Sequence, residues 1–469
     1  MSRINTNVSS LISQINLHRS QGDLQVALNR LSTGLRINSG KDDPAGLIAS
    51  EEIGSDIVAI NKAVSNTQQA NQVIATAESA LGQISKLLND IRGLVTEAAN
   101  TGALSSDQIA ADQLQVDASL EAIDRISSIT SFQGKKLLDG SLNFVTSGVS
   151  SAALASVQIE QATIPTTGPL AVSLTLTTAA TQAQIDTTVA LPLVAQAVVE
   201  VSGSQGSEVF TFGAGTTQAQ IVSAINLVSS ATGVAAAVNG ANVRLSTSGY
   251  GSDEFVAVNV ISGTFTTSAA RATGTNAVGN INGVAWNAKG NHVSINTATL
   301  DLAADLISSF APATTNFSIT GGGALFQLGP DIVANQQSRI GVESVNVAKL
   351  GGTVNGSLRR MYELRSGQAA DLDSDPTAAF QIIDAVINKV ASLRGRLGAF
   401  QRTALDTNIA SLNDTLSNLT EAQSNIRDAD FAVETARLTR AQILVQSGTS
   451  VLQISNQSPQ NVLALLPRG

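Results

Sequence analysis

Cysteine is absent from this chain of 469 residues, which excludes disulfides, thiolate metal sites and thiol catalysis. Histidine is almost absent: His18 and His292 are the only two, and neither stands in a His-Glu-x-x-His or other metal-ligand spacing. The sequence also lacks a G-x-S-x-G elbow, a P-loop and a dinucleotide-binding fingerprint. We therefore expect no enzymatic activity, no cofactor and no metal site.

An excess of positive charge is missing as well. The 27 basic residues are outnumbered by 36 acidic ones, which argues against nucleic acid or an anionic membrane surface as a partner. The sequence contains no run of about 18 apolar residues, the length that a helix needs to cross a bilayer. The first residues, "MSRINTNVSSLISQINLHRSQ", lack the basic segment, apolar core and cleavage site of a secretory signal. If the protein is exported, we expect another machine to carry it.

Proline and aromatic residues are scarce, and their distribution divides the chain. Residues 1–140 contain one proline, Pro44, among many Leu, Ile, Ala, Gln, Asn and Ser, a composition that favours helices. Residues 144–330 are rich in Thr, Val, Gly and Ser, and stretches such as "AVSLTLTT" and "FVAVNVISG" alternate as half-buried strands do. A helical pattern returns from residue 331. The predicted fold is mainly α-helical with a β-rich insertion.

A regular seven-residue repeat follows the first helical region. Apolar residues recur at alternating steps of three and four, with Thr67 as the one polar member: Ile60, Ala63, Thr67, Ala70, Ile74, Ala77, Leu81, Ile84, Leu88, Ile91, Val95 and Ala98. The same step recurs near the other end, with a register shift in the middle: Ile383, Val386, Val390, Leu393, Leu397, Phe400, then Leu405, Ile409, Leu412, Leu416 and Leu419. Such repeats specify long helices that pack along a seam. We predict a long antiparallel helical rod built from both chain ends.

The outermost segments carry narrower apolar stripes among polar residues. These stripes consist of Ile4, Val8, Leu11, Ile15, Leu24, Leu28, Leu31 and Leu35 at one end, and Leu438, Val445 and Leu452 at the other. Helices gain most of their stability by packing such a stripe against another element. The terminal segments should therefore be coiled-coil-like arms that need a partner.

The stretch "RINSGKDDPAGL" separates the first arm from the rod. Asp42 and Asp43 could belong to a metal or acid/base cluster, but the neighbouring Lys41 repels a cation and further ligands are missing nearby. The alternative is a helix stop followed by a helix start. Gly40 suits a left-handed helix end, Asp42 or Asp43 suits an N-cap, and Pro44 suits the first helical position. We interpret the stretch as a joint.

Both ends of the chain resemble bacterial flagellin. The N-terminal match begins with "INTNVSSLISQINLHRSQGDLQVALNRLSTGLRINSGKDDPAGL". The C-terminal match includes "IRDADFAVETARLTRAQILVQSGTSVLQISNQSPQNVLALL". Together the two matches extend over roughly residues 1–143 and 335–466. In the middle, "FTFGAGTTQAQIVSAINLVSSATGVAAAVNG" is similar to the module named for its Ile-Asn pair, here Ile225 and Asn226. The segment expected for this module is residues 200–262.

The resemblance implies a domain plan and a function. Residues 1–45 and 428–469 would be arms in the inner tube of a helical filament, residues 46–143 and 331–427 the two halves of the rod, and residues 144–330 a variable surface region. The expected function is that of a filament subunit for swimming motility. Alternatives are a hook–filament junction protein, or an adhesin or enzyme-bearing flagellin that uses its middle region.

The resemblance also implies partners and an extracellular location. Expected partners are other copies of the chain, an export chaperone on the C-terminal arm, and the filament cap and hook–filament junction proteins, with export through the flagellar type III system without a cleaved signal. Flagellins that stimulate an animal Toll-like receptor carry arginine, leucine and glutamate at positions that match Asp90, Leu94 and Gln115. Because only Leu94 is kept, we expect weak receptor stimulation.

Overall fold

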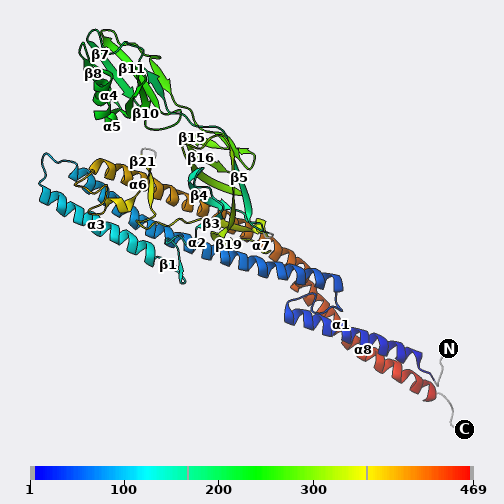
Figure 1. Ribbon diagram of the computed structural model, residues 1–469. Helices are drawn as coiled ribbons and strands as arrows, with labels where there is room; N and C mark the ends of the chain where they lie inside the picture. Colours follow the sequence, from blue (N-terminus) through cyan, green and yellow to red (C-terminus); the bar gives the residue numbers. More distant parts are fainter. Residues whose placement is uncertain (1–5, 166–167, 355–356, 465–469) are drawn as a thin grey trace. The chain divides into compact units, whose positions relative to one another are not determined.

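The computed structural model describes residues 6–165, 168–354 and 357–464 (Figure 1). The chain forms two compact units, one from residues 1–65 and 408–469 and the other from residues 66–407. Among the described residues, none of the helices combines the length and apolar character that a membrane span needs.

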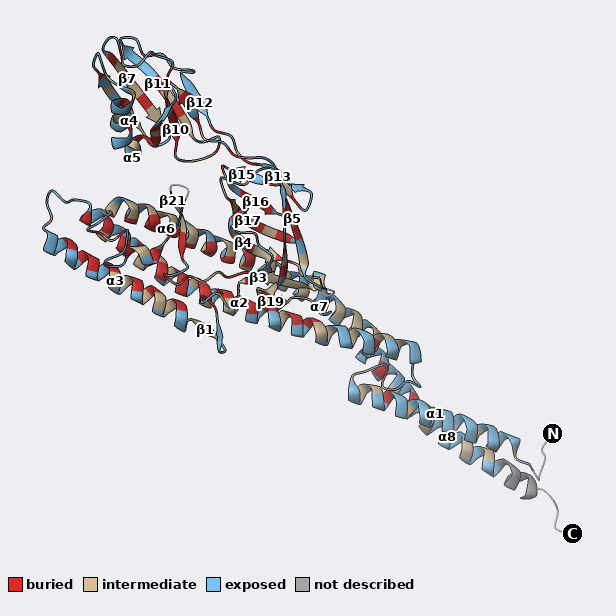
Figure 2. Ribbon diagram, viewed as in Figure 1, coloured by how far each residue is buried: buried red, intermediate tan, exposed pale blue. Residues whose placement is uncertain are grey.

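The first unit consists of helices from both ends of the chain. It contains α1 (Val8–Thr33), the beginning of α2 (Pro44–Ala98), most of α7 (Thr407–Arg427) and α8 (Phe431–Ala464). Helices α1 and α8 lie side by side and run antiparallel, since the start of α1 meets the end of α8. Exposed residues dominate both helices (Figure 2).

The helical part of the second unit is built around the predicted seam. The later part of α2 packs with α3 (Ser106–Ile129) and α6 (Pro376–Phe400) around one core. The seam members from Thr67 to Ala98 are buried here, and so are the six from Ile383 to Phe400; Ile60 and Ala63, which belong to the first unit, are buried as well. Burial of a Leu or Ile side chain contributes about 1.5–3 kcal/mol, so this seam is the main source of stability in the helical part. The predicted seam is confirmed.

The register shift in the C-terminal repeat coincides with a π-helix, η3 (Gln401–Asp406). Phe400 and Leu405 are five residues apart instead of three or four, and a π-helical turn accommodates the additional residue. Leu405 is therefore still buried. Beyond it, Ile409 and Leu412 on α7 are only partly covered.

The insertion contains a first β-rich body with its own apolar core. One antiparallel sheet has the order β14-β13-β5-β18-β3, and a second has the order β15-β16-β17-β4-β20-β19. Their strands are β3 (Phe144–Ser147), β4 (Leu154–Ala162), β5 (Leu170–Thr178), β13 (Val278–Ile281), β14 (Val284–Ala285), β15 (Asn287–Lys289), β16 (His292–Asn296), β17 (Leu300–Leu306), β18 (Thr314–Gly322), β19 (Ala324–Gln327) and β20 (Gln337–Ile340).

A second body, the inner module, has a separate core between residues 183 and 273. It comprises β6 (Gln184–Asp186), β7 (Ala197–Gly203), β8 (Ser207–Phe212), α4 (Gln218–Leu227), α5 (Ser229–Thr232), β9 (Val234–Asn239), β10 (Asn242–Thr247), β11 (Phe255–Ser262) and β12 (Arg271–Thr273). Ile225 is buried in this core, and the Asn226 amide bonds both backbone groups of Ala236, at 2.9 and 2.7 Å. The Ile-Asn pair thus ties α4 to β9.

Short elements complete the fold. They are β1 (Ser131–Phe132), β2 (Lys135–Lys136), η1 (Ala334–Gln336), β21 (Gly351–Val354), β22 (Ser357–Arg360) and η2 (Met361–Leu364). The predicted fold class, mainly α-helical with antiparallel helices from both ends and a strand-rich insertion, is confirmed.

Candidate assembly surfaces on the terminal helices

Polar side chains connect α1 to α8 at the chain ends. The Asn7 amide donates to the Ser455 carbonyl oxygen at 2.7 Å, and the Ser10 hydroxyl donates to the Asn456 side-chain oxygen at 2.7 Å. Asn7 is also the N-cap of α1, because its side-chain oxygen accepts from the Ser10 backbone N–H. The register of the pair is therefore fixed by hydrogen bonds at this end.

A buried ion cluster fixes the opposite end of the pair. Glu434 is 3% exposed, and its Oε1 atom accepts from Arg30 Nη1 at 3.1 Å and Arg437 Nη1 at 2.8 Å. A buried carboxylate needs such partners because water no longer solvates its charge. The apolar stripe in the sequence did not indicate this cluster.

Small residues let the two helices approach closely. Ala27 and Ala441 are buried, and a Cβ atom added at Gly448 would stand 3.3 Å from Leu17 Cδ1. On α8 the covered face coincides with the predicted stripe: Leu438, Val445 and Leu452 are partly buried around Ala441.

On α1 the paired face differs from the predicted stripe. Val8, Leu11, Ile15 and Leu28 remain 49–56% exposed. Leu24, Leu31 and Leu35 are partly covered, and Ile4 lies outside the described residues. The face toward α8 carries Ser10, Ser13, Leu17, Leu24, Ala27 and Leu31. Hydrogen bonds and small side chains determine this pairing, so hydrophobic periodicity could not reveal it.

The pair consequently keeps apolar side chains in solvent, which we call the arm apolar residues. They comprise Val8, Leu11, Ile12 and Ile15 on α1 and Ile443, Leu444, Val451 and Ile454 on α8; Val26, Leu28, Phe431 and Val433 are exposed as well. Exposed apolar side chains of this number on two helices indicate a surface that another molecule covers. Hydrophobic periodicity did not identify Ile12 or these four α8 residues, because each lies beside the narrow stripe instead of on it.

The joint between α1 and α2 is a helix stop followed by a helix start. Pro44 is the first residue of α2, and Asp43 Oδ1 accepts from the Gly46 backbone N–H at 2.9 Å, as an N-cap does. The prediction for Gly40 is wrong: Gly34 directly follows α1 and takes the left-handed conformation, with φ 75°, whereas Gly40 has no positive φ. Helix α1 therefore ends earlier than its repeat suggested.

Asp42 holds the loop of this joint. Its pKa is lowered because the backbone N–H groups of Ser39 and Asn38 and the Ser39 hydroxyl donate to its carboxylate. The loop also pairs with the break between α7 and α8, since the Arg36 N–H donates to the Arg427 carbonyl at 2.7 Å.

The break between α7 and α8 has its own cap. Asp430 Oδ1 accepts from the backbone N–H groups of Ala432 and Val433 at the start of α8. Within the described part of the chain, no group of three or more His, Asp or Glu side chains is placed to hold a metal ion.

The three receptor-equivalent positions lie on α2 and α3. Asp90 and Gln115 are exposed, whereas Leu94 is partly buried against the helical core. The side chains of Asp90 and Gln115 are thus accessible to a partner protein. Their effect on recognition by the receptor stays a prediction.

Comparisons of the sequence with family models and with curated proteins agree on one family. The N-terminal helical region of bacterial flagellin matches residues 4–143, and its C-terminal helical region matches residues 380–466. The B-type flagellin of Pseudomonas aeruginosa is 30% identical over 519 residues, and flagellin of Salmonella typhimurium is 29% identical over 511 residues. Both alignments cover 99% of each chain. The structure of FliC from Burkholderia pseudomallei matches with a TM-score of 0.25 and 16% identity, covering 71% of this chain and 98% of that one.

Proposed function

Because the chain belongs to the bacterial flagellin family and is a structural subunit of the extracellular flagellar filament, we propose that it polymerises through α1 and α8. The observation that supports this proposal is the set of arm apolar residues, which the α1–α8 pairing leaves in solvent. In a filament, neighbouring copies would cover them, and this burial would offset the ordering cost of about 1–2 kcal/mol per backbone residue.

The domain plan and the remaining partners belong to the same proposal. Residues 1–45 and 428–469 form the inner tube, residues 46–143 and 331–427 form the rod, and residues 144–330 face outward. An export chaperone binds the C-terminal arm, the cap and hook–filament junction proteins contact the filament ends, and the subunit leaves through the flagellar type III system without a cleaved signal. The subunit acts as a structural protein and not as an enzyme.

One substitution tests the assembly surface without touching the α1–α8 contact. Ile15→Asp places a charge at a position that is 53% exposed in the unassembled chain. The helix pair should persist, but seeded polymerisation should fail because the filament would bury an unpaired charge. Sedimentation and electron microscopy measure the filament yield.

The matched control is Leu227→Asp, which changes an apolar residue of the inner module that is 84% exposed. This variant should polymerise like the unchanged chain. Normal filament yield from Ile15→Asp would refute the proposed surface.

A further inference from the structure

Two exposed turns of the insertion contain the pair Asn-Gly, in which an asparagine side chain can react with the backbone nitrogen that follows it. Asn239 ends β9 and Gly240 begins the turn to β10, while Asn282 and Gly283 form the turn between β13 and β14. All four residues are exposed. A third pair, residues 355–356, lies outside the described part of the chain. The two described pairs have the same chemistry but different surroundings.

The backbone at Gly240 is open to this reaction. Gly240 takes the left-handed conformation, with φ 62°, which glycine adopts without strain. A Cβ atom added there would meet no described atom within 4 Å, so no neighbouring segment covers the turn. Within the described part of the chain, no group accepts a hydrogen bond from the Gly240 N–H. Gly283 has the same properties, with φ 81°, so the backbone does not distinguish the two pairs.

The two asparagine side chains differ in how firmly they are held. The Asn282 side-chain oxygen accepts from the Ser173 backbone N–H at 2.7 Å, and its amide donates to the Ala171 carbonyl at 3.3 Å. The Asn282 backbone N–H also donates to the Ser173 carbonyl, at 2.8 Å. Among the described residues, the Asn239 side chain has a single hydrogen bond, from its amide to Asp186 Oδ1 at 3.3 Å. Asn239 can therefore turn its carbonyl carbon toward the next nitrogen more easily than Asn282 can.

We propose that Asn239 is a site of spontaneous deamidation, that the fold protects Asn282 from the same reaction, and that the carboxylate created at Asn239 weakens the inner module. The Gly240 nitrogen, after losing its proton to solvent base, attacks the side-chain carbonyl carbon of Asn239 and forms a C–N bond. The bond from that carbon to Nδ2 breaks, and Nδ2 leaves as ammonia after taking up a proton from solvent. The product is a cyclic imide that joins the two residues.

Water then opens the imide in one of two ways. Addition at the side-chain carbonyl carbon cleaves its bond to the Gly240 nitrogen and leaves aspartate. Addition at the main-chain carbonyl carbon cleaves the original peptide bond and leaves isoaspartate, in which the chain continues through the side chain. In both cases the oxygen of water enters the new carboxyl group, and the Gly240 nitrogen regains a proton. Each event makes the formal net charge of -9 more negative by one.

The carboxylate of the aspartate product would face an existing carboxylate. Arg244 on β10 donates from Nε and Nη2 to Asp186 on β6, both at 2.8 Å, and the pKa of Asp186 is lowered by these hydrogen bonds. In the unmodified chain, the Asn239 amide donates to the same ionised group. Deamidation replaces this donor with a second anion, so one guanidinium then faces two carboxylates. The repulsion acts across the sheet of order β6-β10-β9.

Mass spectrometry of chymotryptic peptides tests the proposal on the full-length, unassembled chain. The chain is incubated in mildly alkaline water enriched in the heavy isotope of oxygen, so that deamidation during incubation is distinguished from deamidation during digestion. Because more hydrogen bonds hold Asn282, conversion of Asn239 should be faster by roughly tenfold or more. Equal rates in the folded chain, or an Asn239 that stays intact, would overturn the proposal.

Incubation in denaturant shows the reactivity of the two pairs without the fold. Both asparagines then precede glycine in an unfolded chain, so they should convert at similar rates. A preference for Asn239 that persists in denaturant would come from the local sequence and would contradict protection by the fold. Asn239→Gln keeps the amide but requires a larger ring for the attack, and it should abolish conversion at this position.

Asn239→Asp reproduces the charge of one product. Hydrogen exchange at β6 should be faster in this variant than in Asn239→Gln, because only the aspartate places a carboxylate beside Asp186. Leu227→Asp is the matched control for added charge, since Leu227 is 84% exposed elsewhere on the inner module, and it should exchange like the unchanged chain. Equal exchange at β6 in Asn239→Asp and Leu227→Asp would overturn the proposed weakening of the inner module.

Discussion

Single side chains on the exposed faces of α2 and α3 lead to a prediction about receptor stimulation. Asp90 and Gln115 are exposed, and by the resemblance we expect arginine and glutamate at the matching positions of receptor-stimulating flagellins. A hydrogen bond to a charged group contributes about 1.5–3 kcal/mol, which corresponds to roughly 10- to 100-fold in affinity. The unassembled chain should therefore stimulate reporter cells more weakly than a stimulatory flagellin, and Asp90→Arg with Gln115→Glu should raise its potency.

The control for this prediction is Asp107→Arg, at an exposed position elsewhere on α3. It should leave the potency unchanged. Equal potency of the unchanged chain and a stimulatory flagellin would show that these two positions do not limit recognition.

At the scale of single residues, helix caps were easier to predict than tertiary contacts. Asp43 and Pro44 act within four residues of themselves, so local sequence suffices to place the start of α2. The end of α1 was misplaced because the apolar repeat continues past Gly34 to Leu35, and only the chain conformation distinguishes Gly34 from Gly40 as the helix end. The Glu434 cluster joins residues about 400 positions apart, a separation that no local pattern reports.

At the scale of helices, α1 and α8 differ from the seam helices in burial. Only Ser10 and Ala27 are buried on α1, and only Glu434 and Ala441 on the described part of α8 (Figure 2). Helices with little buried surface open locally at low free energy. Limited proteolysis of the unassembled chain should therefore trim residues 1–45 and 430–469 before it cuts α2 or α6.

Filaments should protect the same segments, because neighbouring copies would cover the arm apolar residues. Mass spectrometry of the fragments identifies the cleavage sites. Arms that resist protease in the unassembled chain as well as α2 does would show that α1 and α8 are stable without assembly.

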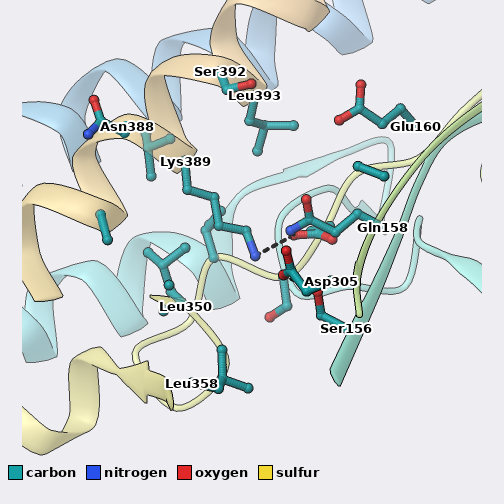
Figure 3. A pocket seen from close by; sticks show the side chains of 18 of the residues that line it. Ser156, Gln158, Glu160, Asp305, Leu350, Leu358, Asn388, Lys389, Ser392 and Leu393 are labelled. Atoms are coloured by element: carbon teal, nitrogen blue, oxygen red, sulfur yellow. Dashed lines mark hydrogen bonds and ion pairs between the residues drawn. The ribbon is translucent and has the colours of Figure 1, made fainter. Parts of the chain in front are cut away.

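The seam helices were predictable because each helical turn repeats the requirement for an apolar residue on the same side. The repeat in α2 identified every buried position from Ile60 to Ala98 except Ala80, and the five-residue step at Phe400 marked the π-helix as a register shift. The strands were recognisable by alternation, but the ion pairs of Lys389 with Glu343 and of Arg396 with Glu160 were not. These residues come from α6, the segment after β20 and β4, which only the folded chain brings together. Figure 3 shows Lys389 reaching from α6 toward the strands.

At the scale of the whole molecule, the inner module is separable from the remainder of the chain. Its core shares no buried residue with the first β-rich body. The strands that enter and leave it are joined at Thr181 and Thr275, where the Thr181 N–H donates to the Thr275 carbonyl at 3.0 Å and the two hydroxyls lie 2.8 Å apart. Removal of residues 183–273 would thus leave two chain ends that already lie side by side.

The shortened chain, with residue 182 joined to residue 274, should fold and polymerise. Short loops between adjacent ends have a small closure cost, and neither the seam of α2 nor the arm apolar residues are touched. Thermal melting of the helical part should change by no more than a few degrees, and electron microscopy should show filaments of smaller diameter. An excision of equal length over residues 150–240 is the control: it removes β4 and β5 from their sheets and should abolish folding of the insertion. If the 183–273 excision also prevents polymerisation while the helical part remains folded, the inner module contributes to filament contacts and is not an independent insertion.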